Sequence, residues 1–200
     1  MADPIDFYFD VSSPYGYFAS VKIDRLGERF GRTVNWRPIM IGTAFKASGN
    51  QPLVAQPLKG EYSKHDWDRL GRFMEVPWHF PDRFPVAALA PSRAFWWLNQ
   101  RDAELARRFA EKVFLAYFGD GRDISDPAVT GMIGEALGVD RAALLEAISQ
   151  AEWKQRLKDE TEAAIARGVF GSPFIMVDGE GFWGADRLWM VKKWLERGGW

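Results

Sequence analysis

A short polar turn near the N-terminus is the first place where this sequence could do chemistry. Residues 12–16 read Ser-Ser-Pro-Tyr-Gly and separate a strand-like run, residues 5–11, from a helix-like stretch, residues 15–30. The first N–H groups of a helix have no partner within the helix, so a turn in this position can stabilise an anion. Ser13 followed by Pro14 is equally a common helix N-cap with no catalytic meaning. The turn alone therefore leaves a reactive site and a plain cap both open.

Cysteine is absent from the chain, and this absence limits the chemistry. It excludes disulfides, thiolate metal sites, dithiol redox chemistry and cysteine nucleophiles, so any thiol chemistry needs a thiol from outside the chain. The only two histidines, His65 and His79, lack the i, i+4 spacing of a helical metal pair. We expect no catalytic metal, and we expect both histidines to be surface polar residues beside aromatics.

Length and composition favour an ordinary folded protein. The 200 residues are 47% hydrophobic and 26% charged, which fits one sizeable domain, or one core with a large insertion. A net charge of -1 without a basic block argues against nucleic acid as a partner. No apolar run is long enough to span a bilayer. Residues 1–6 lack the basic and apolar parts of a secretory signal, so a cytoplasmic location is expected.

The turn is held by elements that can be read along the chain. Residues 5–11, 15–30 and 33–38 predict a strand, a helix and a second strand, and residues 41–60 predict a loop with at most a short helix. From residue 61 the periodicity is helical. Four or five amphipathic helices are expected there, over residues that include 87–100, 102–118, 126–137 and 140–168.

The pattern returns to strands after Gly168. Residues 173–177 and 182–183 predict a hairpin, and Asp186 is expected to open a last helix that ends at Gly198. The order βαβ, helices, ββα predicts an α/β protein with a thioredoxin-like fold and a large all-helical insertion between its halves. The expected domains are residues 1–40 with 169–200, and residues 41–168. In this fold Pro173 is expected to follow a cis peptide bond and to face the turn at Ser13.

An ordered set of motifs resembles one family over nearly the whole chain. The sequence resembles the kappa-class glutathione transferases and the bacterial 2-hydroxychromene-2-carboxylate isomerases, which have a DsbA-like thioredoxin fold. Besides the opening Asp-Phe-Tyr-Phe-Asp and Ser-Pro-Tyr, the motifs are Arg37-Pro38, Ser48-Gly49-Asn50, Lys59-Gly60, Pro77 with His79-Phe80-Pro81, Phe170-Gly171-Ser172-Pro173 and Gly184-Ala185-Asp186-Arg187-Leu188.

The resemblance implies glutathione as a cofactor and assigns residues to it. Ser13 corresponds to the serine beside the glutathione sulfur, and Ser172 to the residue whose backbone pairs with the cysteinyl unit. The implied glutathione-binding residues are Ser13, Pro14, Tyr15, Asn50, Lys59, Ser172, Pro173, Ala185 and Asp186. Two positions depart from the family. Kappa transferases usually carry Ser where Ala185 stands, and a branched apolar residue is usual at Ser172.

The residue types agree with this assignment. Glutathione carries two carboxylates and one ammonium, which suit a cation such as Lys59, a donor such as Asn50 and an anion such as Asp186. The ordinary alternatives are a solvated lysine for Lys59 and an N-cap aspartate for Asp186. Only their joint presence at family positions favours a site.

The resemblance implies an enzyme that acts on a small aromatic acid and forms a homodimer. The favoured reaction interconverts 2-hydroxychromene-2-carboxylate and trans-o-hydroxybenzylidenepyruvate, a step of aromatic breakdown, by reversible addition of a thiolate. The ending at residues 182–190 is more similar to the isomerases than to the transferases. Two alternatives stay open: a kappa-type transferase that consumes glutathione, and a non-catalytic module that binds an extended peptide near Pro173.

Overall fold

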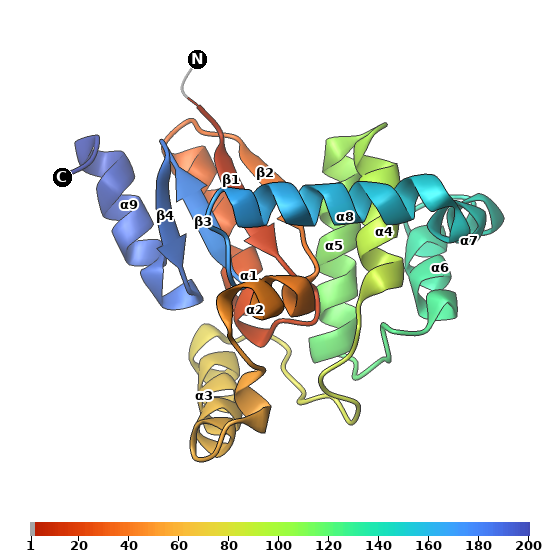
Figure 1. Cartoon of the computed structure of the whole chain (residues 1–200), viewed down its shortest axis with the longest axis horizontal. Coiled ribbons are helices and arrows are strands. Elements are labelled where there is room, and N and C mark those ends of the chain that lie inside the picture. Colours follow the sequence, from red (N-terminus) through yellow and green to blue (C-terminus); the bar gives the residue numbers. More distant parts are fainter. Residues whose placement is uncertain (1–2) are drawn as a thin grey trace.

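A four-stranded mixed sheet lies at the centre of the computed structural model, which describes residues 3–200 (Figure 1). The strand order is β2-β1-β3-β4. β1 (Ile5–Phe9) is parallel to β2 (Val34–Pro38) and antiparallel to β3 (Phe174–Val177), which forms a hairpin with β4 (Glu180–Trp183). The first and last parts of the chain therefore meet in one sheet, as the predicted thioredoxin-like fold requires.

Burial on both faces explains why β1 is central. All five of its residues are buried, and neighbouring side chains of a strand point to opposite faces of the sheet. Phe7 and Phe9 pack edge-on against Trp36 of β2, with ring centroids 5.1 and 5.3 Å apart, in the core that includes α1 (Pro14–Arg29) and α9 (Leu188–Arg197).

The opposite face of the sheet has a core of its own. Tyr8 points there, into a smaller hydrophobic cluster with Ala44 of α2 (Ile41–Ser48) and Ala164 of α8 (Ala151–Ala166). Figure 1 shows α2 and α8 in front of the sheet. Because neighbouring residues of β1 point to opposite faces of the sheet, this one strand contributes side chains to both cores.

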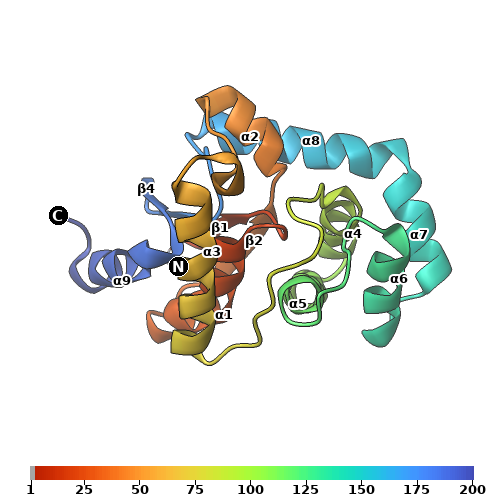
Figure 2. The same ribbon diagram turned by 90° about the horizontal axis from the view of Figure 1, so that it is seen from below.

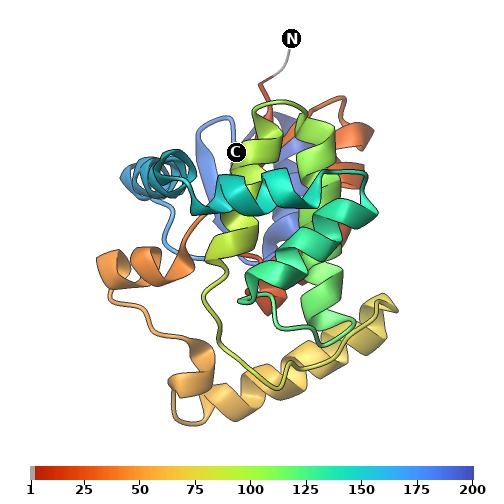
Figure 3. The same ribbon diagram turned by 90° about the vertical axis from the view of Figure 1, so that its right-hand side faces the viewer.

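The remaining helices lie between β2 and β3 in sequence. They are α3 (Lys59–Met74), α4 (Leu89–Asn99), α5 (Ala103–Phe118), α6 (Pro127–Ala136) and α7 (Arg141–Ser149), with a short 3-10 turn at Leu53–Ala55 before them. The ring of Phe9 lies 6.0 Å from that of Phe95 in α4 and 5.6 Å from that of Phe114 in α5. Sheet and helices thus share one core, and the division into two domains stays a prediction. Figure 3 shows α3 set apart along one side of the molecule.

Three element boundaries differ from the sequence prediction. The second hairpin strand, predicted over residues 182–183, begins at Glu180, which pairs with Val177. Residues 59–166 form six α-helices, because the stretch 140–168 is divided at Gln150, whose backbone is extended (φ -67°, ψ 146°). Figure 2 shows the chain turning a corner there between α7 and α8. Asp186 does not cap the last helix. It lies in a 3-10 turn, Ala185–Arg187, and α9 begins at Leu188.

Within residues 3–200, no helix has both the length and the apolar character that crossing a membrane requires.

Candidate active site

The turn after β1 is fixed by backbone and side-chain hydrogen bonds around Ser13. The Ser13 N–H donates to the carbonyl of Asp10 at 2.9 Å, which closes a four-residue turn. Ser13 is the N-cap of α1, and its Oγ accepts the N–H of Gly16 at 3.1 Å. The same hydroxyl donates to the carbonyl of Ser172 at 3.0 Å. Ser13 is therefore a cap, as the plain interpretation requires, and it also bridges to a segment 159 residues away.

The facing segment is built around a cis peptide bond between Ser172 and Pro173, as predicted from the sequence. Its approach to the turn is close. A Cβ atom at Gly16 would lie 3.0 Å from the Ser172 Oγ and 3.3 Å from the Asp10 carbonyl, so only glycine fits at that position without a shift. The Ser172 Oγ accepts the N–H of Asp10 at 2.9 Å. The Ser172 hydroxyl thus ties the two halves of the site together.

Asp10 lies behind the turn as a buried carboxyl group that pairs with no cation among residues 3–200. It accepts the N–H and the hydroxyl of Ser12 at 2.9 and 2.7 Å, and the N–H of Ile41 at 3.0 Å. Burial raises the pKa of Asp10, and these hydrogen bonds oppose that rise only in part. Because Ile41 is the first residue of α2, Asp10 fixes the turn relative to the helix that leads to Asn50.

A cleft of about 1250 Å³ opens beside the turn. Its walls come from the turn itself with one face of α1, the loop from α2 to α3, α3, residues 84–92, the segment before β3 and the 3-10 turn after β4. All nine residues assigned from the sequence line this cleft: Ser13, Pro14, Tyr15, Asn50, Lys59, Ser172, Pro173, Ala185 and Asp186. The fold thus brings together residues from four separate segments. Their role in binding a ligand stays a prediction.

Several polar groups of the cleft are not used by the protein itself. Within residues 3–200, the N–H groups of Tyr15 and Ser172 make no hydrogen bond, and Lys59 takes part in no ion pair. Asp186 is engaged, since Arg187 donates to its carboxylate at 2.6 Å, but both side chains are exposed. Unpaired donors next to a helix N-terminus make the turn suitable for an anion such as a thiolate.

The sequence interpretation missed the apolar wall of the cleft and the partner of Tyr15. The Tyr15 hydroxyl donates to Asp66 of α3 at 2.8 Å, and its ring packs edge-on against Trp67 with centroids 5.9 Å apart. Burial, followed by the hydrogen bond to Asp66, raises the pKa of Tyr15, so it stays a neutral phenol. The apolar side chains of this wall are Phe18, Trp67, Leu70, Phe73, Met74, Phe84 and Val86. Helical periodicity predicted α3 but did not show which of its faces lines a cleft.

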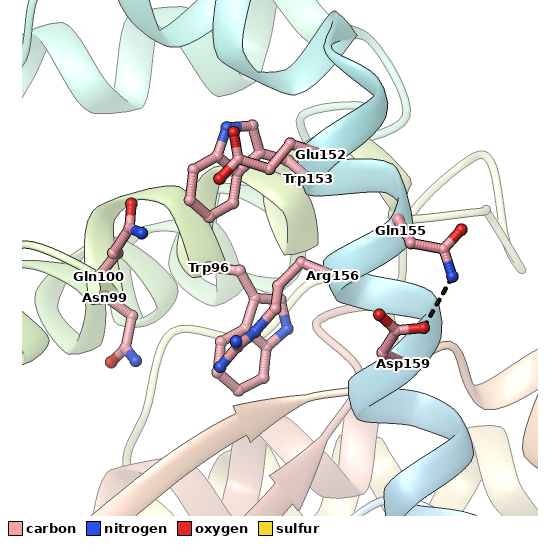
Figure 4. Close-up of a pocket in the computed structure, with 8 residues that line it drawn as sticks. All are labelled: Trp96, Asn99, Gln100, Glu152, Trp153, Gln155, Arg156 and Asp159. Atoms are coloured by element: carbon pink, nitrogen blue, oxygen red, sulfur yellow. Dashed lines mark hydrogen bonds between the residues drawn. The ribbon is translucent and has the colours of Figure 1, made fainter.

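A second, smaller pocket lies away from the turn, between α4 and α8 (Figure 4). Its volume is about 390 Å³. The guanidinium of Arg156 lies over the ring of Trp96, 5.2 Å from its centroid, and pairs with Glu160 at 2.6 Å. The amide of Gln155 donates to Asp159 at 2.7 Å, as the dashed line in Figure 4 marks. These four polar side chains therefore already have partners within the protein.

Comparison with known proteins places the chain in a family. The model of the DSBA-like thioredoxin domain matches residues 4–196. The chain belongs to this family. It is 32% identical, over 98% of its length and 99% of the relative's, to a 2-hydroxychromene-2-carboxylate isomerase of Sphingobium xenophagum. It is 27% identical to glutathione S-transferase kappa 1 of Homo sapiens, over 96% of this chain and 92% of that one.

A solved structure agrees with the sequence relatives. That of a 2-hydroxychromene-2-carboxylate isomerase superimposes with a TM-score of 0.88 at 28% identity, over 96% of this chain and 94% of that one. The family resemblance and the fold class expected from the sequence are both confirmed.

Proposed function

We propose that this protein is a glutathione-dependent isomerase that interconverts 2-hydroxychromene-2-carboxylate and trans-o-hydroxybenzylidenepyruvate, or a closely related pair of aromatic acids. The observation that carries the proposal is the convergence of nine residues from four segments on one cleft, with Ser13 at the helix N-terminus opposite the cis bond before Pro173. Relatives named for this reaction cover almost the whole chain, which supports the same conclusion.

The cleft suits glutathione in both shape and charge. Lys59 offers a cation for one carboxylate, and Asp186 offers an anion for the γ-glutamyl ammonium if it exchanges Arg187 for the ligand. The free N–H of Ser172 suits a peptide carbonyl of the cysteinyl unit, as an added strand would use it. Ala185 contributes no hydroxyl, so this chain binds the γ-glutamyl end with one contact fewer than a serine would provide.

Ser13 is the residue placed to stabilise a thiolate. Its Oγ already accepts the Gly16 N–H, so it is held in place, and its proton can turn from the Ser172 carbonyl towards an anion in the cleft. Lowering a thiol pKa of 8.5 by about 2 units requires about 2.7 kcal/mol. The helix N-terminus contributes about 0.3 to 2 kcal/mol and a hydroxyl hydrogen bond to a charged group about 1.5 to 3 kcal/mol. Together they suffice without a general base.

Glutathione, when bound, would supply a thiolate that adds reversibly to the conjugated double bond once the hemiketal C–O bond of the chromene ring has opened to a phenol and a ketone. The resulting single bond is free to rotate, and loss of the thiolate restores conjugation. The apolar wall of α3 and the segment at residues 84–86 would hold the aromatic ring and exclude water from it. Tyr15, fixed by Asp66, closes the wall next to Ser13.

The proposal is tested by following the ultraviolet spectrum of 2-hydroxychromene-2-carboxylate with purified protein, with and without glutathione. We expect conversion only when glutathione is present, and no loss of glutathione over many turnovers. Conversion that is equally fast without glutathione would contradict the cofactor. No conversion under any condition would contradict the isomerase.

A kappa-type transferase is the second candidate, because relatives of that name match 96% of the chain at 24 to 27% identity. Such an enzyme would consume one glutathione for each electrophile, so glutathione mass balance separates the two reactions. A peptide-binding module without catalysis would show no stoichiometric glutathione site in calorimetric titration. The homodimer and the cytoplasmic location implied by the resemblance stay predictions.

A further inference from the structure

One face of α1 runs along the cleft beyond the turn. Pro14, Phe18 and Lys22 follow each other at intervals of four residues, which places them on the same side of a helix, and all three line the cleft. Phe18 is buried, whereas Lys22 is exposed at the far end of this row. The cleft therefore has Ser13 at one end of a helical face and a lysine at the other.

Lys22 stands among apolar neighbours. Its ammonium lies 5.9 Å from the ring centroid of Phe73, a residue of α3 that is 77% exposed. Leu70 and Met74 line the same wall. Within residues 3–200, Lys22 takes part in no ion pair, and Asp24, the nearest acid along α1, is engaged with Arg107 and Trp36. The cation is thus available to a ligand that lies on the apolar wall.

The other cations of the cleft occupy different surroundings. Lys46 belongs to α2 and Lys59 begins α3, on either side of the loop that carries Asn50, and Arg187 is paired with Asp186. These three border the region assigned to glutathione. Lys22 is the one cation that α1 contributes to the described cleft.

We infer that Lys22 binds the carboxylate of the aromatic substrate. The inference rests on the proposed function and adds to it the residue that selects an acid. The rise of the helix places Lys22 about 13 Å along α1 from Ser13, and its stem reaches back about 6 Å, because helical side chains lean towards the N-terminus. The remaining distance is about 7 Å, the size of a small conjugated acid bound with its double bond near the thiol.

The experiment compares Lys22→Met and Lys22→Arg with the wild type, using trans-cinnamate and its uncharged amide as probes. Methionine keeps the apolar stem and removes the charge, so we expect cinnamate to bind about three to ten times more weakly while the amide is unaffected. Lys22→Arg keeps a positive charge, so we expect this variant to retain most of the preference for cinnamate over its amide. With 2-hydroxychromene-2-carboxylate, KM should rise by the same factor, kcat should change little, and glutathione affinity should stay constant. Lys154→Met, an exposed lysine of α8 outside the cleft, is the matched control.

The outcomes separate this inference from the proposed function. Equal affinity of the wild type for acid and amide would overturn the role of Lys22, as would a loss of acid preference in Lys46→Met instead. A wild type that isomerises the substrate, with an unchanged KM in Lys22→Met, would leave the proposed function standing and remove only this residue. If the folded wild type has no isomerase activity but Lys22→Met still loses the preference for the acid, Lys22 binds a carboxylate and the proposed isomerase function is wrong. Circular dichroism of each variant confirms that it is folded.

Discussion

The cleft beside Ser13 and the pocket between α4 and α8 both combine tryptophans with charged side chains, but they use their polar groups differently. In the pocket, Arg156 covers Trp96 and pairs with Glu160, and Gln155 binds Asp159. The pocket side chains without a partner among residues 3–200 are half-buried or exposed: Asn99, Gln100 and Glu152. In the cleft, described backbone donors and Lys59 are left without partners. The pocket also draws on two packed helices, whereas the nine assigned residues of the cleft come from four distant segments.

This contrast teaches that residue types alone do not mark a site. Two amphipathic helices that pack together leave hollows wherever their side chains do not fill the space, and charged residues close such hollows by pairing with each other. A site for a ligand instead needs unpaired polar groups that a rigid fold holds in place, as it holds the backbone donors beside Ser13. The predictions below change one region and use the other as its control.

Ser13→Ala is expected to have the largest effect. Loss of the hydroxyl should raise the pKa of bound glutathione by about 1 to 2 units, so the thiolate fraction and the activity near pH 7 fall about 10- to 100-fold. Activity should recover in part as the pH rises through the new pKa. Loss of the cap should also lower the free energy of unfolding by about 0.5 to 2 kcal/mol. Thiolate absorbance near 240 nm, rates against pH and thermal unfolding measure these effects. A variant that is destabilised but keeps its thiol pKa and rate would show that Ser13 is only a cap.

Lys59→Ala should weaken glutathione binding about tenfold, because it removes a charge that no protein group neutralises. Asp186→Ala should weaken it only about threefold, since that carboxylate must first release Arg187. Calorimetric titration measures both dissociation constants, and rates at saturating glutathione should fall less. Asp159→Ala, in the second pocket, is the control. If the wild type and these three variants bind glutathione with equal affinity, Lys59 and Asp186 do not belong to the site.

Ala185→Ser tests whether the missing hydroxyl limits binding. The serine adds the contact that kappa transferases carry, and we expect glutathione affinity to increase about two- to fivefold. The same titration measures it. Unchanged or weaker binding would mean that the backbone at this position already provides the whole contact.

Arg156→Ala should have the smallest effect on function. It uncovers Trp96 and breaks the pair with Glu160, so the free energy of unfolding should fall by less than about 1 kcal/mol. Isomerase rates and glutathione affinity should stay within about twofold of the wild type. A large loss of activity would break the comparison, because it would show that the second pocket also contributes to function.

The fold followed closely from the sequence because its signals are local. Alternating aromatics predicted β1, and the turn signal at residues 178–181 predicted the hairpin of β3 and β4. The turn itself is shorter and consists of Asp178 and Gly179, both with positive φ. The corner at Gln150 was missed because neither glycine nor proline marks it. Asp186 was mistaken for a cap because its residue type fits an N-cap, while a 3-10 turn moves the N-cap by one residue to Arg187.

Only those residues of the site that belong to sequence motifs could be predicted from the sequence. Ser13 and Pro173 stand at positions that strand and helix ends define, so their meeting could be expected. Asp66 and Lys22 could not, since the choice of which face of α3 or α1 borders a cleft depends on how helices pack, and that is a property of the whole chain. Periodicity shows that a helix has an apolar face without showing what the face meets.

The hydrogen bond from the Ser13 hydroxyl to the Ser172 carbonyl also limits when, during synthesis, the proposed glutathione site can first form. A ribosome makes the chain from its N-terminus, so α1 and its cap exist long before β3, which must pair with β1 to complete the site. A growing chain therefore has the helix end but not the facing backbone. If glutathione binds as proposed, its stabilisation would reach only chains whose synthesis is nearly finished, and we expect that added glutathione does not rescue a chain truncated before β3.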